Sequence, residues 1–232
     1  MSPFIGEFMG TALLTTMGGG VVANVILSKT KGNNGGWIVI TFGWAMAVFL
    51  GVYASKTLGG SGHLNPAVTI ALSAFGDFDD SLVVTYLAAQ FAGAFAGAVV
   101  VWIVYKQHFD ITEDKDFKLG VFATAPAIRN PLFNLLTEII GTFILVFGAL
   151  TMSKSAQSLG ELPVGLLVLG IGLSLGGATG YAINPARDLG PRIAHFILPI
   201  KNKRDSDWSY AWIPVVGPIA GAAMAALLFR SL

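Results

Sequence analysis

The sequence predicts an all-α membrane protein with six spanning helices and two shorter helices that enter the membrane without crossing it. Three observations support this prediction: the composition, the lengths of the apolar stretches, and a tripeptide, Asn-Pro-Ala, that occurs twice. Of the 232 residues, 54% are hydrophobic and 12% are charged, whereas a soluble domain carries about 25% charged residues. The chain therefore has too little charge to cover a soluble surface.

The composition also excludes several kinds of site. The net charge of +1 provides no basic face for nucleic acid, and the absence of Cys excludes disulfides and thiolate metal sites. The three histidines, His63, His108 and His195, are scattered and predict no metal site. No spanning segment carries a nucleophile–base pair, so we expect neither an enzyme nor a cofactor. The N-terminus lacks the basic start and cleavage site of a secretory signal, so the first apolar segment is expected to be retained.

The apolar stretches have two lengths. A helix needs about 20 apolar residues to cross a bilayer, and six segments meet this requirement. Two more, Pro66–Phe75 and Pro185–Leu198, are too short to span, and segments of that length are often re-entrant. The six predicted spans are roughly Phe4–Leu27, Trp37–Ser55, Leu82–Val104, Leu132–Met152, Leu162–Gly176 with some extension, and Ala211–Phe229.

The two halves of the chain resemble each other. GEFMGT in the first half and TEIIGT in the second place Glu7 against Glu138. Because each half has three spans, the second copy must enter the membrane in the opposite orientation, which predicts an inverted repeat. The matched tripeptides are Asn65-Pro66-Ala67 and Asn184-Pro185-Ala186.

The polar segment 106–131 is predicted to form a central loop between the two halves. We treat residues 1–232 as a single domain, with the first repeat at 1–110 and the second at 132–232. Residues 111–131 then form the connecting loop.

Each Asn-Pro pair predicts a helix that begins at the Pro, because Pro suits the first helical position and Asn the capping position before it. A helix that begins inside the membrane is tolerated where the irregular backbone ahead of it is buried or lines a cavity. Two inverted half-helices would meet N-terminus to N-terminus, and their positive dipole ends would repel cations and protons. The Asn oxygens would cap the helices, leaving the NH₂ donors free to face a lumen.

With these motifs the chain resembles the aquaporin superfamily of water and small-solute channels, from GEFMGT through SGHLNPAVTIAL and GYAINPARDLGPR to the last span. The resemblance implies a right-handed bundle of six spanning helices and two half-helices. It also implies a pore in each protomer and a homotetramer in the plasma membrane, in contact with membrane lipids. Both termini are expected in the cytoplasm.

The basic residues oppose that orientation. Only Lys56, Lys154 and Arg230 of the 14 Lys and Arg residues fall on the expected cytoplasmic face, and the positive-inside rule would favour the reverse. We keep the orientation that the resemblance implies, in which the filter Arg faces the outer vestibule.

The resemblance implies a selectivity filter formed by Trp44, Gly172, Tyr181 and Arg187. Water-selective members of the superfamily narrow the filter with a His at the position of Gly172, where this chain is expected to leave a gap. Trp44 and Tyr181 would form an apolar corner for a carbon backbone, and Arg187 would bind hydroxyl groups. This combination favours the glycerol-conducting branch.

The resemblance also assigns roles outside the filter. Three further features, Asp188, Arg192 and Pro214-Val215, fit the glycerol-conducting branch. Carboxylates expected to support the re-entrant loops are Glu7, Glu138 and Asp188. Backbone carbonyls expected to face the pore are those of Gly62, His63, Gly180, Tyr181 and Ala182.

We expect passive passage of glycerol and water, with dihydroxyacetone, urea, hydrogen peroxide and protonated lactic acid as further small neutral solutes. Ions and protons should be excluded. One alternative is a water-selective channel of the same fold, which Gly172 disfavours. The other is an ion-coupled secondary transporter, a class that also has inverted repeats and broken helices. Such a transporter needs buried titratable groups, and the spans offer only Glu7 and Glu138.

Overall fold

The computed structural model describes residues 1–155 and 159–232, and the regular elements in these ranges are all helices. Six of the described helices are long and apolar enough to cross a membrane. Their ends lie within three residues of the predicted boundaries, so the prediction of six spans is confirmed. They are α1 (Pro3–Ile26), α2 (Trp37–Thr57), α4 (Val83–Val104), α7 (Pro131–Ser155), α8 (Leu162–Thr179) and α10 (Ile213–Ser231).

The two short helices begin at the Pro of each Asn-Pro-Ala, as predicted. They are α3 (Pro66–Phe75) and α9 (Pro185–Ile197). Each is capped by the preceding Asn, whose side-chain oxygen accepts a hydrogen bond from the first free backbone N–H groups. The local chemistry of Asn and Pro therefore sets the point at which each helix starts.

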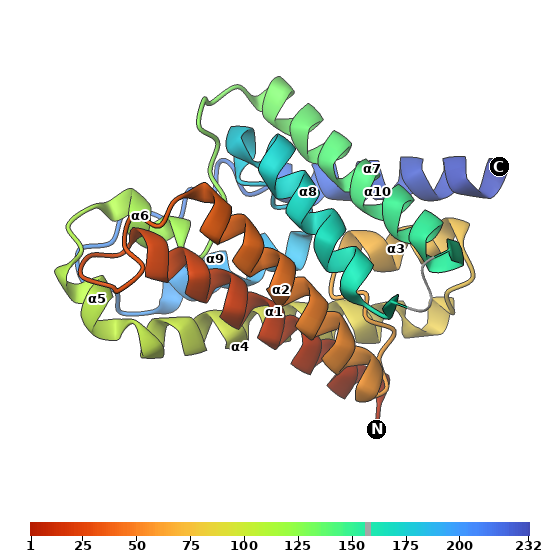
Figure 1. Cartoon of the computed structure of the whole chain (residues 1–232), viewed down its shortest axis with the longest axis horizontal. Coiled ribbons are helices and arrows are strands. Elements are labelled where there is room, and N and C mark those ends of the chain that lie inside the picture. Colours follow the sequence, from red (N-terminus) through yellow and green to blue (C-terminus); the bar gives the residue numbers. More distant parts are fainter. Residues whose placement is uncertain (156–158) are drawn as a thin grey trace.

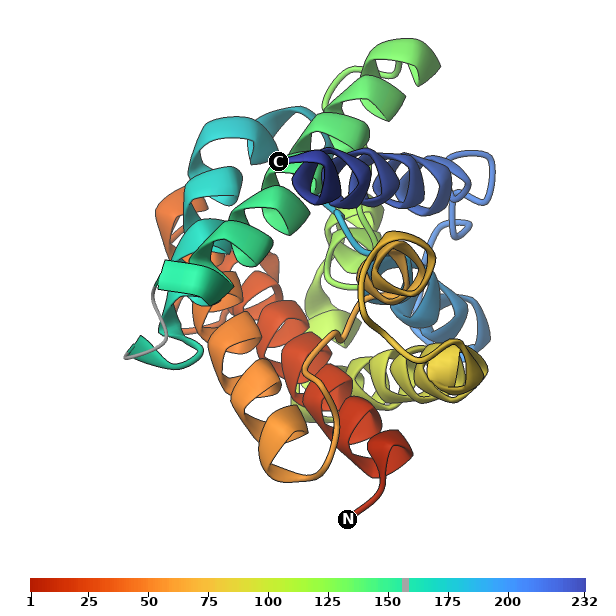
Figure 2. The ribbon, with the colours of Figure 1, turned by 90° about the vertical axis from the view of Figure 1, so that its right-hand side faces the viewer.

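The helices pack in matched pairs. Helix α1 packs against α2 and α4, and α7 packs in the same way against α8 and α10. Each half-helix packs against a spanning helix of the other half: α3 packs against α10, and α9 packs against α4. Figure 2 shows α3 end-on between α10 and α4. This arrangement is that of an inverted repeat; the residue boundaries of the two repeats stay a prediction.

Close approach of the helix backbones depends on glycine. A Cβ atom at Gly93 of α4 would lie 2.3 Å from the carbonyl oxygen of Phe8 in α1. At the matching contact, a Cβ at Gly221 of α10 would lie 2.2 Å from the carbonyl oxygen of Ile139 in α7. Small residues of this kind let helices approach closely in lipid, where the hydrophobic effect does not drive them together.

Figure 1 places both chain ends toward one end of the molecule, which we call the terminal end, and α5 and α6 toward the opposite end. These two helices, α5 (Lys106–Ile111) and α6 (Lys115–Gly120), correct the expectation that 106–131 is a loop throughout. The Asp114 carboxylate caps α6, and the side chains of Phe109 and Leu119 are buried. The burial of these apolar side chains thus holds the otherwise polar segment 106–131 against the bundle.

Candidate functional site

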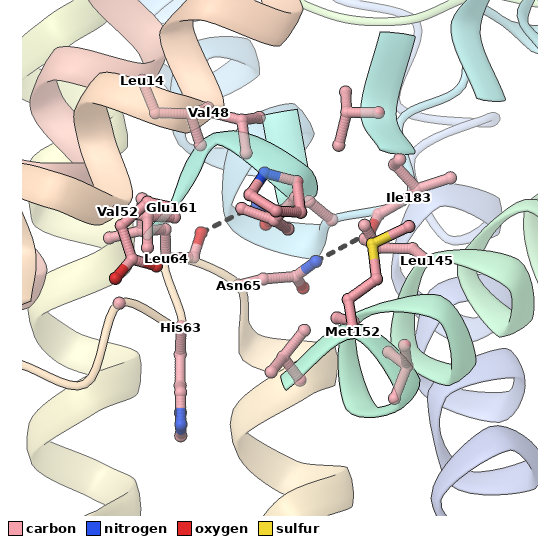
Figure 3. Close-up of a pocket in the computed structure, with 18 of the residues that line it drawn as sticks. Leu14, Val48, Val52, His63, Leu64, Asn65, Leu145, Met152, Glu161 and Ile183 are labelled. Carbon is pink, nitrogen blue, oxygen red and sulfur yellow. Dashed lines mark hydrogen bonds between the residues drawn. The ribbon is translucent and has the colours of Figure 1, made fainter. Parts of the chain in front are cut away.

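A cavity of about 560 Å³ runs between the two halves of the bundle. Its wall includes both re-entrant loops and parts of α2, α7 and α8, and most of that wall is apolar. Trp44, Tyr181 and Arg187 line it toward one end, and Lys56 and Glu161 line it toward the terminal end. Figure 3 shows part of this wall, with Asn65 between the labelled side chains.

The two capping asparagines are cross-linked through the backbone of the opposite loop. The Asn65 side-chain Nδ2 donates to the carbonyl oxygen of Ile183 at 2.8 Å, and Asn184 Nδ2 donates to that of Leu64 at 2.8 Å. Figure 3 marks both hydrogen bonds. The expectation of wholly free NH₂ groups therefore needs correction. One N–H of each amide joins the two loops, and the other remains for the cavity, which both residues line.

Leu64 and Ile183 adopt the left-handed backbone conformation that lets these carbonyls accept. Their φ angles are +51° and +44°, in a region that L-residues rarely occupy and that costs about 1–3 kcal/mol each. The two residues occupy equivalent places, directly before each Asn. Such strain persists only where neighbouring contacts fix the backbone, and two buried carboxylates provide those contacts.

Glu7 fixes the first loop. Its side chain is fully buried in α1, and each of its carboxylate oxygens accepts more than one hydrogen bond. The shortest is the 2.7 Å bond from the backbone N–H of Leu64 to Oε2. The other donors are the backbone N–H groups of Gly62 and His63, the Ser55 hydroxyl and the Gln90 side-chain amide.

Glu138 occupies the equivalent place in α7 and fixes the second loop. Its carboxylate is buried and accepts from the backbone N–H of Ile183 at 2.7 Å and that of Ala182 at 3.1 Å. The Thr179 hydroxyl donates a third bond at 2.7 Å. Both oxygens of each buried carboxylate thus accept hydrogen bonds from neighbouring donors.

Arg187 lies against Trp44 on the cavity wall. Its Cζ atom is 4.0 Å from the centroid of the Trp44 ring, a cation–π contact. Its Nη1 donates to the carbonyl oxygen of Phe122 at 3.4 Å, and only 8% of the residue is exposed. The guanidinium is therefore held in place while further N–H groups stay available.

Gly172 does not leave an open gap, which corrects the expectation from the sequence. A Cβ atom built on it would lie 2.9 Å from Cζ of Tyr181 and 2.9 Å from Cγ2 of Thr41. The Tyr181 ring therefore fills the space that the missing side chain provides, and Gly172 itself is not among the residues that line the cavity.

The residues whose backbone carbonyls were expected to face the pore differ in whether they line the cavity. Gly62, His63, Tyr181 and Ala182 line the cavity, whereas Gly180 is not among the lining residues. Gly180 ends α8 with φ +80°, and a Cβ there would lie 3.3 Å from Thr124 in the segment after α6. Gly180 thus turns the chain at the end of α8 and lies next to that segment.

Asp188 supports the segments around the filter together with Arg192. Asp188 Oδ2 accepts from the N–H and hydroxyl of Thr124 at 2.8 and 2.7 Å, and Oδ1 accepts from Arg192 Nε at 2.8 Å. Arg192 also donates to the carbonyl oxygens of Thr124 and Ser206 at 2.9 and 2.7 Å. Both charged side chains are fully buried, so the pair ties two loops to α9.

A second ion pair lies outside the spans, between Arg129 and Asp207. Burial opposes ionisation of Asp207, but hydrogen bonds from Arg129 and Ser209 outweigh it and hold the pKa of that carboxyl below its ordinary value. The loop that contains Asp207 therefore stays anchored at neutral pH.

At the terminal end of the cavity, Lys56 of α2 reaches across to Glu161, the residue before α8. The Lys56 Nζ lies 2.8 and 2.9 Å from the two Glu161 carboxylate oxygens. The Lys56 side chain is half exposed.

Among the described residues, no group of three or more His, Cys, Asp and Glu side chains is placed to hold a metal ion.

Sequence reasoning missed several residues of this site. The repeat could have pointed to Leu64 and Ile183, because both directly precede the Asn of an Asn-Pro-Ala. Ser55, Gln90 and Thr179, which donate to the buried carboxylates, carry no local signal, because their role depends on how distant helices pack.

Comparison with known proteins agrees with this geometry. Residues 1–229 match the family described as Major intrinsic protein. The chain is 55% identical over 232 residues to the "Probable glycerol uptake facilitator protein" of Thermotoga maritima, covering 99% of each chain. It is 53% identical over 231 residues to the "Glycerol uptake facilitator protein" of a Streptococcus pneumoniae strain, covering 99% of this chain and 98% of that protein.

Among solved structures, the chain is similar to the aquaglyceroporin from Plasmodium falciparum. The TM-score is 0.86 at 33% identity, covering 99% of this chain and 95% of the other. The helix order, the paired re-entrant loops and the match over 1–229 lead to one conclusion: this chain is a multi-pass membrane protein that belongs to the major intrinsic protein family.

Proposed function

We propose that this protein is a passive channel that conducts glycerol across the membrane through the cavity between its two halves. The observation that carries the proposal is the cavity wall, on which Arg187 and the two Asn amides offer donors beside an extended apolar surface. The names of the relatives, glycerol uptake facilitators and an aquaglyceroporin, agree with it.

Glycerol fits this wall because one side of the molecule is a carbon chain and the other carries hydroxyl groups. The carbon chain can lie against Trp44, the Tyr181 ring and the valines of α2, Val48 and Val52. The hydroxyls can accept from Arg187 and donate to the backbone carbonyls of the loops. Trp44, Tyr181 and Arg187, together with Gly172, which makes room for the Tyr181 ring, are the proposed selectivity elements.

Exclusion of ions and protons follows in this proposal from three features. The N-termini of α3 and α9 both point their partial positive charge at the Asn pair, and Arg187 adds a full charge. The carboxylates Glu7 and Glu138, which could otherwise attract a cation, already accept hydrogen bonds from the loops on both oxygens. Among the described lining residues the one carboxylate is Glu161, which Lys56 neutralises, so a desolvated cation at the Asn pair meets repulsion without compensation.

Water and small neutral solutes such as dihydroxyacetone, urea, hydrogen peroxide and protonated lactic acid should also pass. The protein acts as a channel without enzymatic chemistry, in a homotetramer in the plasma membrane, with both termini in the cytoplasm. In that orientation the terminal end of the cavity is the inner mouth.

The test is stopped-flow light scattering on proteoliposomes that contain the purified protein. We expect vesicles in a glycerol gradient to re-swell much faster than protein-free vesicles, at a rate linear in glycerol concentration and independent of ion gradients. Fast water flow without glycerol flow would contradict the proposal and favour a water-selective channel. Glycerol flux that saturates or follows an ion gradient would favour a coupled transporter.

A further inference from the structure

The first residue of α2, Trp37, lies beside the proposed filter without lining the cavity. Its indole Nε1 donates to the carbonyl oxygen of Gly172 in α8 at 3.0 Å. Its ring meets the Tyr181 ring edge to face, with centroids 5.9 Å apart and planes at 76°, a favourable geometry for aromatic pairs. Trp37 thus contacts both the ring of a filter residue and the backbone behind that ring.

Two glycines of α8 make the slot in which these rings lie. A Cβ at Gly176 would lie 2.4 Å from Cδ1 of Tyr181 and 2.9 Å from Cζ2 of Trp37. A Cβ at Gly172 would lie 2.9 Å from Cζ of Tyr181. The Tyr181 ring therefore has α8 on one side and Trp37 at its edge, and these contacts fix how far it extends into the cavity.

Nothing intrinsic to Tyr181 holds the ring in this slot. Its φ of +38° is unfavourable for an aromatic L-residue, so the local backbone preference works against the observed conformation. Its hydroxyl is buried and has no hydrogen-bond partner within the described part of the chain. The position of the ring consequently depends on the surfaces that surround it.

We propose that Trp37 is a positioning residue for selectivity, which holds the Tyr181 ring against α8 and thereby sets the width of the filter. This inference rests on the proposed glycerol channel. Because 40% of Trp37 is exposed at the surface of the bundle, its removal opens space on the side of Tyr181 away from the cavity. The ring then retreats into that space, the filter widens, and polyols larger than glycerol pass more easily.

The experiment compares glycerol, erythritol and water permeability of proteoliposomes that contain wild type, Trp37→Leu, Trp37→Phe or Trp212→Leu. Trp212 is the matched control, since it is also about half exposed, at 45%, and lies outside the cavity wall.

We expect Trp37→Leu to raise the ratio of erythritol to glycerol permeability by about 2- to 10-fold, the range for loss of an aromatic contact. Trp37→Phe keeps an edge for the ring and should fall between wild type and Trp37→Leu. Trp212→Leu should match wild type.

A double substitution tests whether Trp37 acts through Tyr181. In a Tyr181→Leu background, adding Trp37→Leu should leave the solute ratio unchanged, because the ring it positions is gone. An unchanged ratio in both Trp37 variants, in protein that elutes as the same oligomer as wild type, would overturn the inference. If wild type itself does not conduct glycerol, the proposed function fails instead, so the two failures are distinguishable.

Discussion

Replacing Gly172 by Ala adds one methyl group at the back of the proposed filter and should slow glycerol more than water. The new Cβ would lie 2.9 Å from Cζ of Tyr181 and 2.9 Å from Cγ2 of Thr41. Carbon atoms pack comfortably at about 3.5 Å or more, so the Tyr181 ring has to move by about 0.6 Å away from α8. Because Tyr181 lines the cavity, that movement narrows the passage.

The size of the effect follows from the energy of overpacking. An extra methyl group in a well-packed site costs about 1–3 kcal/mol. If about 1–2 kcal/mol of this appears in the barrier for glycerol, the glycerol permeability falls about 5- to 30-fold. Water, which needs a narrower opening, should slow less. Stopped-flow light scattering on proteoliposomes with equal protein content measures both rates.

Gly170 supplies the control for this prediction. It lies on the same helix, and a Cβ built there meets no atom of the described residues within 4 Å. Gly170→Ala should therefore conduct glycerol at the wild-type rate, and its helix should be at least as stable. If Gly172→Ala conducts glycerol as fast as Gly170→Ala, the Tyr181 ring does not limit the passage and the filter assignment is refuted.

Three further predictions concern the supports around the cavity, each read from thermal unfolding in detergent. Glu138→Ala leaves buried N–H groups of the second loop without an acceptor, which costs about 1–3 kcal/mol for each group. The unfolding midpoint should therefore fall to a much lower temperature, and an unchanged midpoint would contradict the anchoring role. Arg192→Met leaves the buried Asp188 carboxylate without its partner and should destabilise the folded protein by about 3–5 kcal/mol. Adding Asp188→Asn should recover part of that stability. No recovery would show that the two residues do not act as a buried ion pair. Lys56→Met removes a half-exposed ion pair with Glu161, worth less than about 1 kcal/mol, and a large shift would argue against that weak coupling.

The spans and half-helices could be predicted because their signals are local. The length of an apolar run decides whether a helix can cross, and Asn65-Pro66 and Asn184-Pro185 mark helix starts through the capping chemistry of those residues alone. The structure begins α3 and α9 at those prolines. Segment 106–131 was mistaken for loop because the burial of Phe109 is a tertiary effect that polar composition conceals.

The geometry around the filter depended on contacts between distant segments. The sequence indicates that position 172 lacks a side chain, but only packing shows that the Tyr181 ring occupies the space. Likewise, Asn65 could be predicted as a cap from its own helix, whereas its bond to Ile183 requires both re-entrant loops to meet. Trp37 gave no local signal, since its partners are 135 and 144 residues away in the chain.

Passage of glycerol through the cavity between the two halves can be tested directly, because the chain has no native Cys. Leu145→Cys places one thiol on the cavity wall, where Figure 3 shows the side chain. Ile144→Cys places a thiol on the next residue of α7, which is 38% exposed and does not line the cavity.

The decisive measurement is glycerol permeability of proteoliposomes before and after a small mercurial, with labelling verified by mass spectrometry. We expect the mercurial to lower the glycerol permeability of Leu145→Cys vesicles nearly to that of protein-free vesicles, and a reducing thiol to restore it. Wild type and Ile144→Cys should be insensitive. Unchanged glycerol flow through fully labelled Leu145→Cys would show that glycerol does not pass through this cavity and would contradict the proposed function.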